Sequence, residues 1–293
     1  MKRLGKILLA CMAVLVLLVA ATFGTAWWSS ERAMARHFVV ADPPLPPADD
    51  SRSDHGRHIF ETRGCADCHG LRGEGRVVMD VPPVRMVASN LTSGGVGGRY
   101  DREAIARAVR HGVGHDGLPL RLMPAIDYAE MSDGDVAALA DFLATLPSVD
   151  NDPGQTQIRW LGRLLYLAGR IDLVPAEHVD HAPRARAAPA VAMNADYGGY
   201  LAHTCRGCHG ADYRGQRVPG TPPELPPASD LTALDTWRDQ DFLRVMREGI
   251  RPDGRVLHPL MPWQAFRTMT DEELGALWLY FDSLPGAPTA RRG

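Results

Sequence analysis

The chain has 293 residues, of which 45% are hydrophobic and 23% are charged, and its formal net charge is −3. This length is enough for about two ordinary domains, and the composition is that of a globular protein rather than a disordered or coiled-coil chain. The slightly acidic balance argues against a nucleic-acid-binding protein. Five cysteines are too few for a disulfide scaffold in a chain of this length.

Residues 1–29 have the pattern of a helix that spans a membrane. Three basic residues among the first six are followed by 22 uncharged residues, from Ile7 to Trp28. As a helix this run is about 33 Å long, which matches the apolar core of a bilayer. The positive flank predicts that the following residues lie across a bacterial inner membrane, in the periplasm. A cleaved signal peptide is the alternative, and it exports the same residues.

Residues 30–52 are predicted to form a tether between this helix and the rest of the chain. Prolines and acidic residues dominate its second half, which reads DPPLPPADD. Such a composition favours an extended and solvated chain.

Beyond the tether the sequence repeats itself. The offset is 140 residues from Cys65 to Cys205 and 138 residues from Met123 to Met261. A repeat of this length predicts two copies of one domain, which we place at residues 53–148 and 191–286. Residues 149–190 join them, with a helix expected between Ile158 and Ile171, and residues 287–293 form a tail.

Each copy is predicted to be mostly helical. Apolar spacing and capping residues indicate three helices in the first copy, at 55–63, at 101–111 and after Ser132. Their counterparts lie at 196–204, at 238–248 and after Thr270. No stretch alternates clearly enough to predict a strand. The expected fold class is therefore all-α, with two small helical domains after a transmembrane helix.

The pattern Cys-x-x-Cys-His occurs once in each copy and is the attachment signature of c-type haem. One short turn presents two thiols to one edge of the macrocycle, and the next residue reaches the iron. A zinc site would need four ligands at another spacing, and a thioredoxin-like pair would need a strand–helix setting. We therefore expect two covalently bound haem c groups, on Cys65, Cys68 and His69 and on Cys205, Cys208 and His209.

The sixth iron ligand is predicted to be a methionine in each copy. Met123 and Met261 both lie in the sequence Leu-Met-Pro, 54 and 52 residues after His69 and His209. A segment that faces the ring from the opposite side needs about that much chain, and a thioether suits low-spin iron. Other methionines either have no counterpart in the second copy or directly precede a helix.

With these residues in place, the chain resembles the class I cytochrome c family in a tandem di-haem form. The stretches NLTSGGVGG and MSDGDVAALADFLATLP look like cytochrome c subunits of periplasmic quinoprotein and flavoprotein dehydrogenases. Those subunits often carry three haems, whereas this chain has two motifs. The resemblance implies a small all-α fold around one haem per domain.

The function that follows from this sequence is transfer of single electrons, without catalytic activity of its own. The donor would be a quinol or a dehydrogenase, and the acceptor a terminal oxidase or a soluble cytochrome. Iron held by His on one side and Met on the other leaves no position open for a substrate. The alternatives are a di-haem enzyme of the peroxidase or thiosulfate-oxidising type with one open haem, and a gas or redox sensor.

Overall fold

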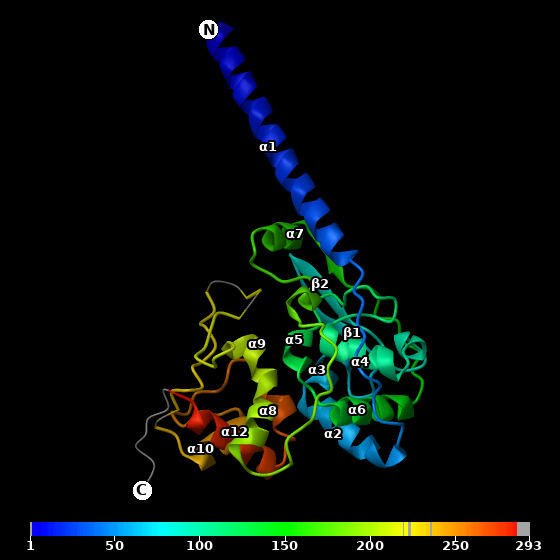
Figure 1. Cartoon of the computed structure of the whole chain (residues 1–293). Coiled ribbons are helices and arrows are strands. Elements are labelled where there is room, and N and C mark those ends of the chain that lie inside the picture. Colours follow the sequence, from blue (N-terminus) through cyan, green and yellow to red (C-terminus); the bar gives the residue numbers. More distant parts are fainter. Residues whose placement is uncertain (1, 219, 222–223, 235, 286–293) are drawn as a thin grey trace.

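The computed structural model describes residues 2–218, 220–221, 224–234 and 236–285 (Figure 1). The predicted tail, residues 287–293, lies outside the described residues. Helices dominate, as expected, and they form one long projecting helix and two helical groups that lie side by side. The two groups correspond to the two copies of the repeat, and we call residues 53–148 the first repeat and residues 191–286 the second repeat.

Helix α1 (Lys2–Met34) projects from the body of the molecule (Figure 1). Among the described residues it is the one helix long and apolar enough to cross a membrane, judged by length and composition. It continues past residue 29, where we expected the tether to begin. The reason is that its last turn packs against the body, where Ala33 and Met34 are buried with Leu173 and Val174.

The extended chain after α1 is largely exposed, but parts of it are held against the body. Leu45 is buried in the core of the first repeat. The carboxylate of Asp42 accepts a hydrogen bond from Arg186 at 3.0 Å and lies 2.8 Å from the His111 imidazole. Apolar and charged contacts of this kind hold the segment against the body, although its composition is that of a free linker.

The first repeat is built around the crossing of its first and last helices. It contains α2 (Ser53–Thr62), α3 (Cys65–His69), α4 (Arg102–His111), α5 (Ala125–Tyr128) and α6 (Asp133–Thr145). Phe60 on α2 lies 5.4 Å from Phe142 on α6, as predicted for the core. Ser132 caps α6 through the backbone N–H of Asp135, and α4 ends at Gly112, whose φ of 64° favours glycine.

The second repeat has the same plan. It contains α8 (Ala195–Ala202), the short 3₁₀ helix η4 (His203–Cys205), α9 (Arg206–His209), α10 (Asp239–Glu248), α11 (Trp263–Phe266) and α12 (Asp271–Ser283). Thr270 and Glu273 form the capping box that starts α12. Helices α8 and α12 cross and bury Leu201, Leu277 and Phe281.

A glycine at each helix crossing shows how the two repeats superimpose. A Cβ on Gly56 would lie 1.9 Å from the Ala138 carbonyl oxygen, and one on Gly198 would lie 2.0 Å from that of Ala276. Gly56 is nine residues before Cys65, whereas Gly198 is seven residues before Cys205. Two residues are therefore missing before the second Cys motif.

A small sheet in the first repeat was not predicted. Strands β1 (Arg76–Val81) and β2 (Val84–Ala88) form an antiparallel hairpin, and β3 (Gln157–Ile158) pairs with β2. The alternation that identifies a strand was absent because almost every residue of β1 is exposed. The fold is thus mostly helical with a few strands, rather than all-α.

The joining segment holds α7 (Trp160–Leu167), inside the range expected to be helical. It lies where α1 meets the body (Figure 1). The short 3₁₀ helix η3 (Pro175–His178) follows, and the chain then runs without regular structure to α8.

Candidate functional site

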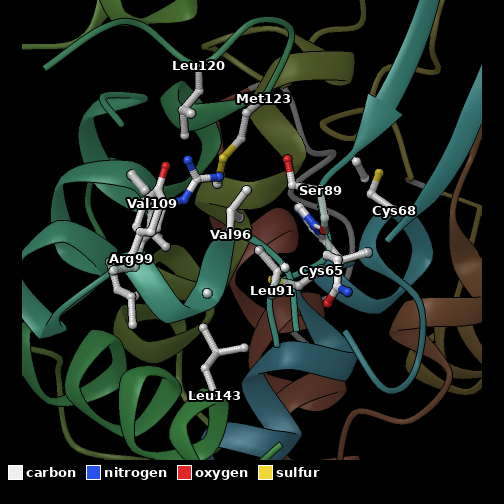
Figure 2. Close-up of a pocket in the computed structure, with 18 of the residues that line it drawn as sticks. Cys65, Cys68, Ser89, Leu91, Val96, Arg99, Val109, Leu120, Met123 and Leu143 are labelled. Atoms are coloured by element: carbon white, nitrogen blue, oxygen red, sulfur yellow. Dashed lines mark hydrogen bonds between the residues drawn. The ribbon is translucent and has the colours of Figure 1, made fainter. Parts of the chain in front are cut away.

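A cavity of about 1130 Å³ lies in the first repeat, and the predicted residues Cys65, Cys68, His69 and Met123 all line it. Figure 2 shows the two cysteines and Met123 entering this space from different segments of the chain. Its walls are largely apolar and include Leu91, Val96, Val109, Leu120 and Leu143. The volume slightly exceeds the upper range for pockets that hold drug-sized ligands, so a group as large as a porphyrin fits.

Helix α3 presents the first Cys motif to this cavity. It runs from Cys65 to His69, between Gly64 and Gly70. The φ angles of these two glycines, 77° and 82°, allow the sharp turns on both sides. Burial raises the pKa of the Cys65 thiol to about 12 and also raises that of Cys68. Reactive cysteines need a lowered pKa, so these thiols are unlike those of a thiol–disulfide redox pair.

The histidine of each motif is oriented by the same hydrogen bond. The Nδ1 atom of His69 lies 2.8 Å from the Ser89 carbonyl oxygen, and that of His209 lies 2.8 Å from the Ser229 carbonyl oxygen. A carbonyl oxygen only accepts, so Nδ1 carries the proton and Nε2 keeps its lone pair. Burial lowers the pKa of both imidazoles, which favours the neutral form that binds iron.

The two predicted methionine ligands occupy equivalent turns. The carbonyl of Met123 accepts from Ala125 N at the start of α5, and that of Met261 accepts from Trp263 N at the start of α11. Leu122 has a φ of 63°, a conformation that costs a leucine about 1–2 kcal/mol. This strained residue directs the backbone at Met123, which lines the cavity.

In the second repeat, two of the four predicted residues share one apolar core. Cys205 and Met261 pack against the same apolar cluster, and His209 is buried. Burial raises the pKa of the Cys205 thiol to about 12, as at Cys65. The local chemistry therefore repeats, although residues 219, 222–223 and 235 of this region lie outside the described part of the chain.

The polar residues that follow each histidine stabilise turns. Asn90 Oδ1 accepts from the backbone and the hydroxyl of Thr92, and Asp230 Oδ1 accepts from the same two groups of Thr232. Asn90 also donates through Nδ2 to the Val149 carbonyl at 2.8 Å. These contacts show that both pairs act as turn formers in this structure.

Sequence reasoning missed one wall of the cavity. Residues 151–156 of the joining segment and residues 86–88 of β2 line it. Asn151 holds this wall by donating to the carbonyls of Glu74 and Gly75. Neither stretch has a counterpart in the second repeat that would have marked it. Arg99 and Arg121 also line the cavity, where their charge suits the carboxylates of a haem.

The two Cys motifs lie near each other because the repeats pack through the segments that carry them. Arg63, two residues before Cys65, is 6% exposed and donates to the Leu201 carbonyl at 3.0 Å and the Thr204 hydroxyl at 3.3 Å. From the other side of the contact, Gly207 N donates to the Asp127 carboxylate at 2.9 Å. Burial raises the pKa of Asp127 to about 7.

This contact is approximately symmetric. Glu273 at the start of α12 lies 2.9 Å from the His58 imidazole on α2. Asp135, at the equivalent place on α6, accepts from the Tyr200 hydroxyl on α8. The glycine crossings make His58 and Tyr200 equivalent, although Tyr200 stands five residues before Cys205, as Phe60 does before Cys65. The second repeat has two residues fewer before its Cys motif. An alignment of the two motifs therefore misaligns the preceding helices by two residues.

Comparison with known proteins supports this assignment of the first repeat. Residues 51–143 match the family described as cytochrome c oxidase, cbb3-type, subunit III. The cytochrome c subunit of the quinone-dependent alcohol dehydrogenase of Gluconacetobacter polyoxogenes is 24% identical over 287 aligned residues, 84% of this chain and 58% of that protein.

Two further relatives match shorter stretches. The cbb3-type cytochrome c oxidase subunit CcoP of Helicobacter pylori (strain 52) is 30% identical over 98 residues, 33% of this chain and 29% of the relative. The cytochrome c subunit of gluconate 2-dehydrogenase from Pantoea cypripedii is 29% identical over 96 residues, 29% of this chain and 22% of the relative. The chain therefore spans less than two thirds of the length of each of these relatives.

The Cys-x-x-Cys-His motif and the methionine Met123 that line the cavity both lie in the matched segment, whereas the wall formed by residues 151–156 lies outside it. The fold is mostly helical, and the relatives that match it are cytochrome c subunits of dehydrogenases and oxidases. The chain carries a cytochrome c family domain of the cbb3 type, which implies covalently bound haem c, in residues 51–143.

Proposed function

We propose that this chain is a membrane-anchored di-haem c-type cytochrome that transfers single electrons in the periplasm. Its donor is a quinol or a dehydrogenase, and its acceptor is a terminal oxidase or a soluble cytochrome. A haem at each Cys motif supplies reversible one-electron exchange at its iron. The residues of the chain hold that group, orient its ligands and set its surroundings.

One observation supports the proposal above the others, namely that both motif histidines donate Nδ1–H to a serine carbonyl 20 residues further on, at 2.8 Å. The bond fixes the ring and leaves Nε2 as the acceptor for a metal. A duplicated motif that had lost its role would not keep this arrangement. Together with the equivalent Met123 and Met261 turns, this supports two six-coordinate sites.

The packing of the repeats supports electron exchange within one chain. Arg63 donates to residues just before the second Cys motif, and Asp127 accepts from Gly207 inside that motif. Contacts across the whole interface, including His58 with Glu273, fix the separation of the two motifs. These residues act by positioning, because a fixed separation of the two motifs favours electron transfer between their haems.

The relatives support the choice of partners. They are named as cytochrome c subunits of alcohol dehydrogenase and of cbb3-type oxidase. An anchor of the length of α1 would confine the protein to a membrane surface and raise its effective concentration near partners bound to the same membrane.

The test is a spectroscopic potentiometric titration of the full chain purified in detergent. We expect two one-electron steps, low-spin spectra in both redox states, and no spectral change on adding carbon monoxide to the reduced protein. Binding of carbon monoxide by the native protein would overturn the proposal and favour an enzyme with one open haem, and a high-spin signal would do the same.

A further inference from the structure

Helix α7 has an apolar face that the described chain covers only in part. Trp160, Leu161 and Leu167 are 50%, 44% and 41% exposed. Leu164 and Leu165 are partly exposed, and Ala168 just beyond the helix is exposed. At 100° per residue, these six residues share one side of the helix. A surface helix of a soluble protein normally turns charged and polar residues outward, so this arrangement is reversed.

The opposite face is held tightly by the body. A Cβ on Gly162 would lie 2.4 Å from the Pro83 carbonyl oxygen, so α7 lies directly on the turn of the β1–β2 hairpin. Arg163 is buried, and its guanidinium donates to the Ser30 hydroxyl and the Glu31 carboxylate of α1. The apolar face is therefore fixed outward and cannot turn into the core.

Contacts with α1 place α7 at a defined level along that helix. The ring of Trp160 lies 5.2 Å from those of Phe23 and Trp27, and the Arg163 guanidinium lies 3.8 Å over the Trp27 ring. Phe23 and Trp27 are in the last part of the uncharged run that ends at Trp28. Tryptophans at the end of such a run are typical of the membrane–water boundary.

We propose that α7 lies in the headgroup boundary of the bilayer that α1 spans, with Trp160, Leu161 and Leu164 inserted among the lipids. The inference rests on the proposed membrane anchoring. The ligand is a phospholipid surface, because the exposed apolar face is continuous with the apolar end of α1, and an interfacial helix binds through apolar area of this kind. Arg170, exposed just after the helix, suits lipid phosphates.

The consequence is a fixed orientation of the body. A single helix can tilt in the bilayer and carry the body with it, whereas a second contact with the membrane surface restricts this tilt. From α7 the contact passes through Pro83 to β2, whose last residues line the cavity of the first repeat. The first repeat is therefore held at a set angle to the membrane.

The test is photolabelling of the full chain in phosphatidylcholine nanodiscs that contain a phospholipid with a diazirine on its acyl chain. Labelled peptides are quantified by mass spectrometry for α1, for α7 and for α12, whose Leu279 is 40% exposed and serves as the matched apolar control. We expect label in α1 and α7, with at least about fivefold more in α7 than in α12.

Label in α1 without label in α7 would overturn the inference and leave the anchor intact. Absence of label from α1 would contradict the anchoring itself, and the inference would fail with it. Equal label in α7 and α12 would also overturn it, because it would mean only nonspecific capture by apolar side chains. As a further check, the double substitution Leu161→Asp and Leu164→Asp should abolish labelling of α7 and leave that of α1 unchanged, whereas Leu279→Asp should change neither.

Discussion

The two repeats keep the same arrangement around the motif histidine and differ in the segments that surround it. In both, the motif histidine donates to a serine carbonyl and a Leu-Met-Pro turn precedes a short helix. The first repeat adds a β hairpin, a wall from the joining segment and the contacts of α7 with α1. The comparison indicates that only a few positions near the Cys motif must stay the same. The segments around them can differ, and in the first repeat they contact α1.

The two extra residues before the first Cys motif show how such a difference is used. They lengthen the segment between Gly56 and Cys65, and that segment carries Arg63. The arginine fills the contact between the repeats and reaches the chain just before the second motif. His203 stands the same distance before Cys205 as Arg63 does before Cys65, and burial lowers its pKa, so the second repeat supplies a weaker cation there.

The largest effect is expected from removing one predicted iron ligand. Met123→Ala should open the iron of the first repeat to carbon monoxide and halve the methionine-sulfur charge-transfer absorption of the oxidised protein, because Met261 is untouched. Absorption spectra of both redox states measure this. A change at both sites, or at neither, would contradict the assignment of Met123.

A smaller but still severe effect is expected at the helix crossing. Gly56→Ala would place a methyl group 1.9 Å from a backbone oxygen, so α2 and α6 must move apart. Overpacking of this kind costs about 1–3 kcal/mol of unfolding free energy, measured by denaturant titration. Gly134→Ala in α6 is the control, since its Cβ has no neighbour closer than 3.9 Å, and it should be neutral or stabilising.

Substitution of Arg63 distinguishes an electrostatic role of this residue from a role in packing alone. Removing this buried cation with Arg63→Gln should lower the reduction potentials of both haems, because a positive charge favours the reduced iron at each motif. Potentiometric titration measures both values. Arg57→Gln, at an exposed position in α2, should leave both potentials unchanged. A fall at the first haem alone would show that Arg63 does not act on the second repeat.

The last predicted effect is a pH dependence due to Asp127. Burial raises its pKa in the folded protein to about 7, above the ordinary value of 3.8. The folded state therefore binds the proton of Asp127 more tightly than the unfolded state does. This proton stabilises the fold fully below about pH 4, and the stabilisation is lost as the pH rises to about 7. Denaturant titrations across this range should show Asp127→Asn gaining stability relative to the wild type as the pH rises. A stability difference between variant and wild type that does not change with pH would contradict the raised pKa of Asp127.

The sequence was sufficient for those parts of the fold that depend on local patterns. Caps at Ser132 and Thr270 and the glycine after α4 located the helices to within a few residues. The hairpin was missed because β1 is almost entirely exposed and neither strand shows alternating burial. The joining segment's wall was missed because Asn151 acts only through backbone carbonyls that lie far away in sequence.

The same contrast applies to the site. Cys65, Cys68, His69 and Met123 were predicted from spacing alone, and the structure brings all four to one cavity. The partners of the histidines and the cation at Arg63 could not be predicted, since each depends on how distant segments pack.

Intact-protein mass spectrometry of the purified chain gives the most direct test of the account. The measured mass should exceed that of the polypeptide by two haem groups, and the variant with Cys205→Ala and Cys208→Ala should exceed its own polypeptide mass by one. A native protein that carries a single haem, or none, would contradict the conclusion that the duplicated motif is duplicated in function.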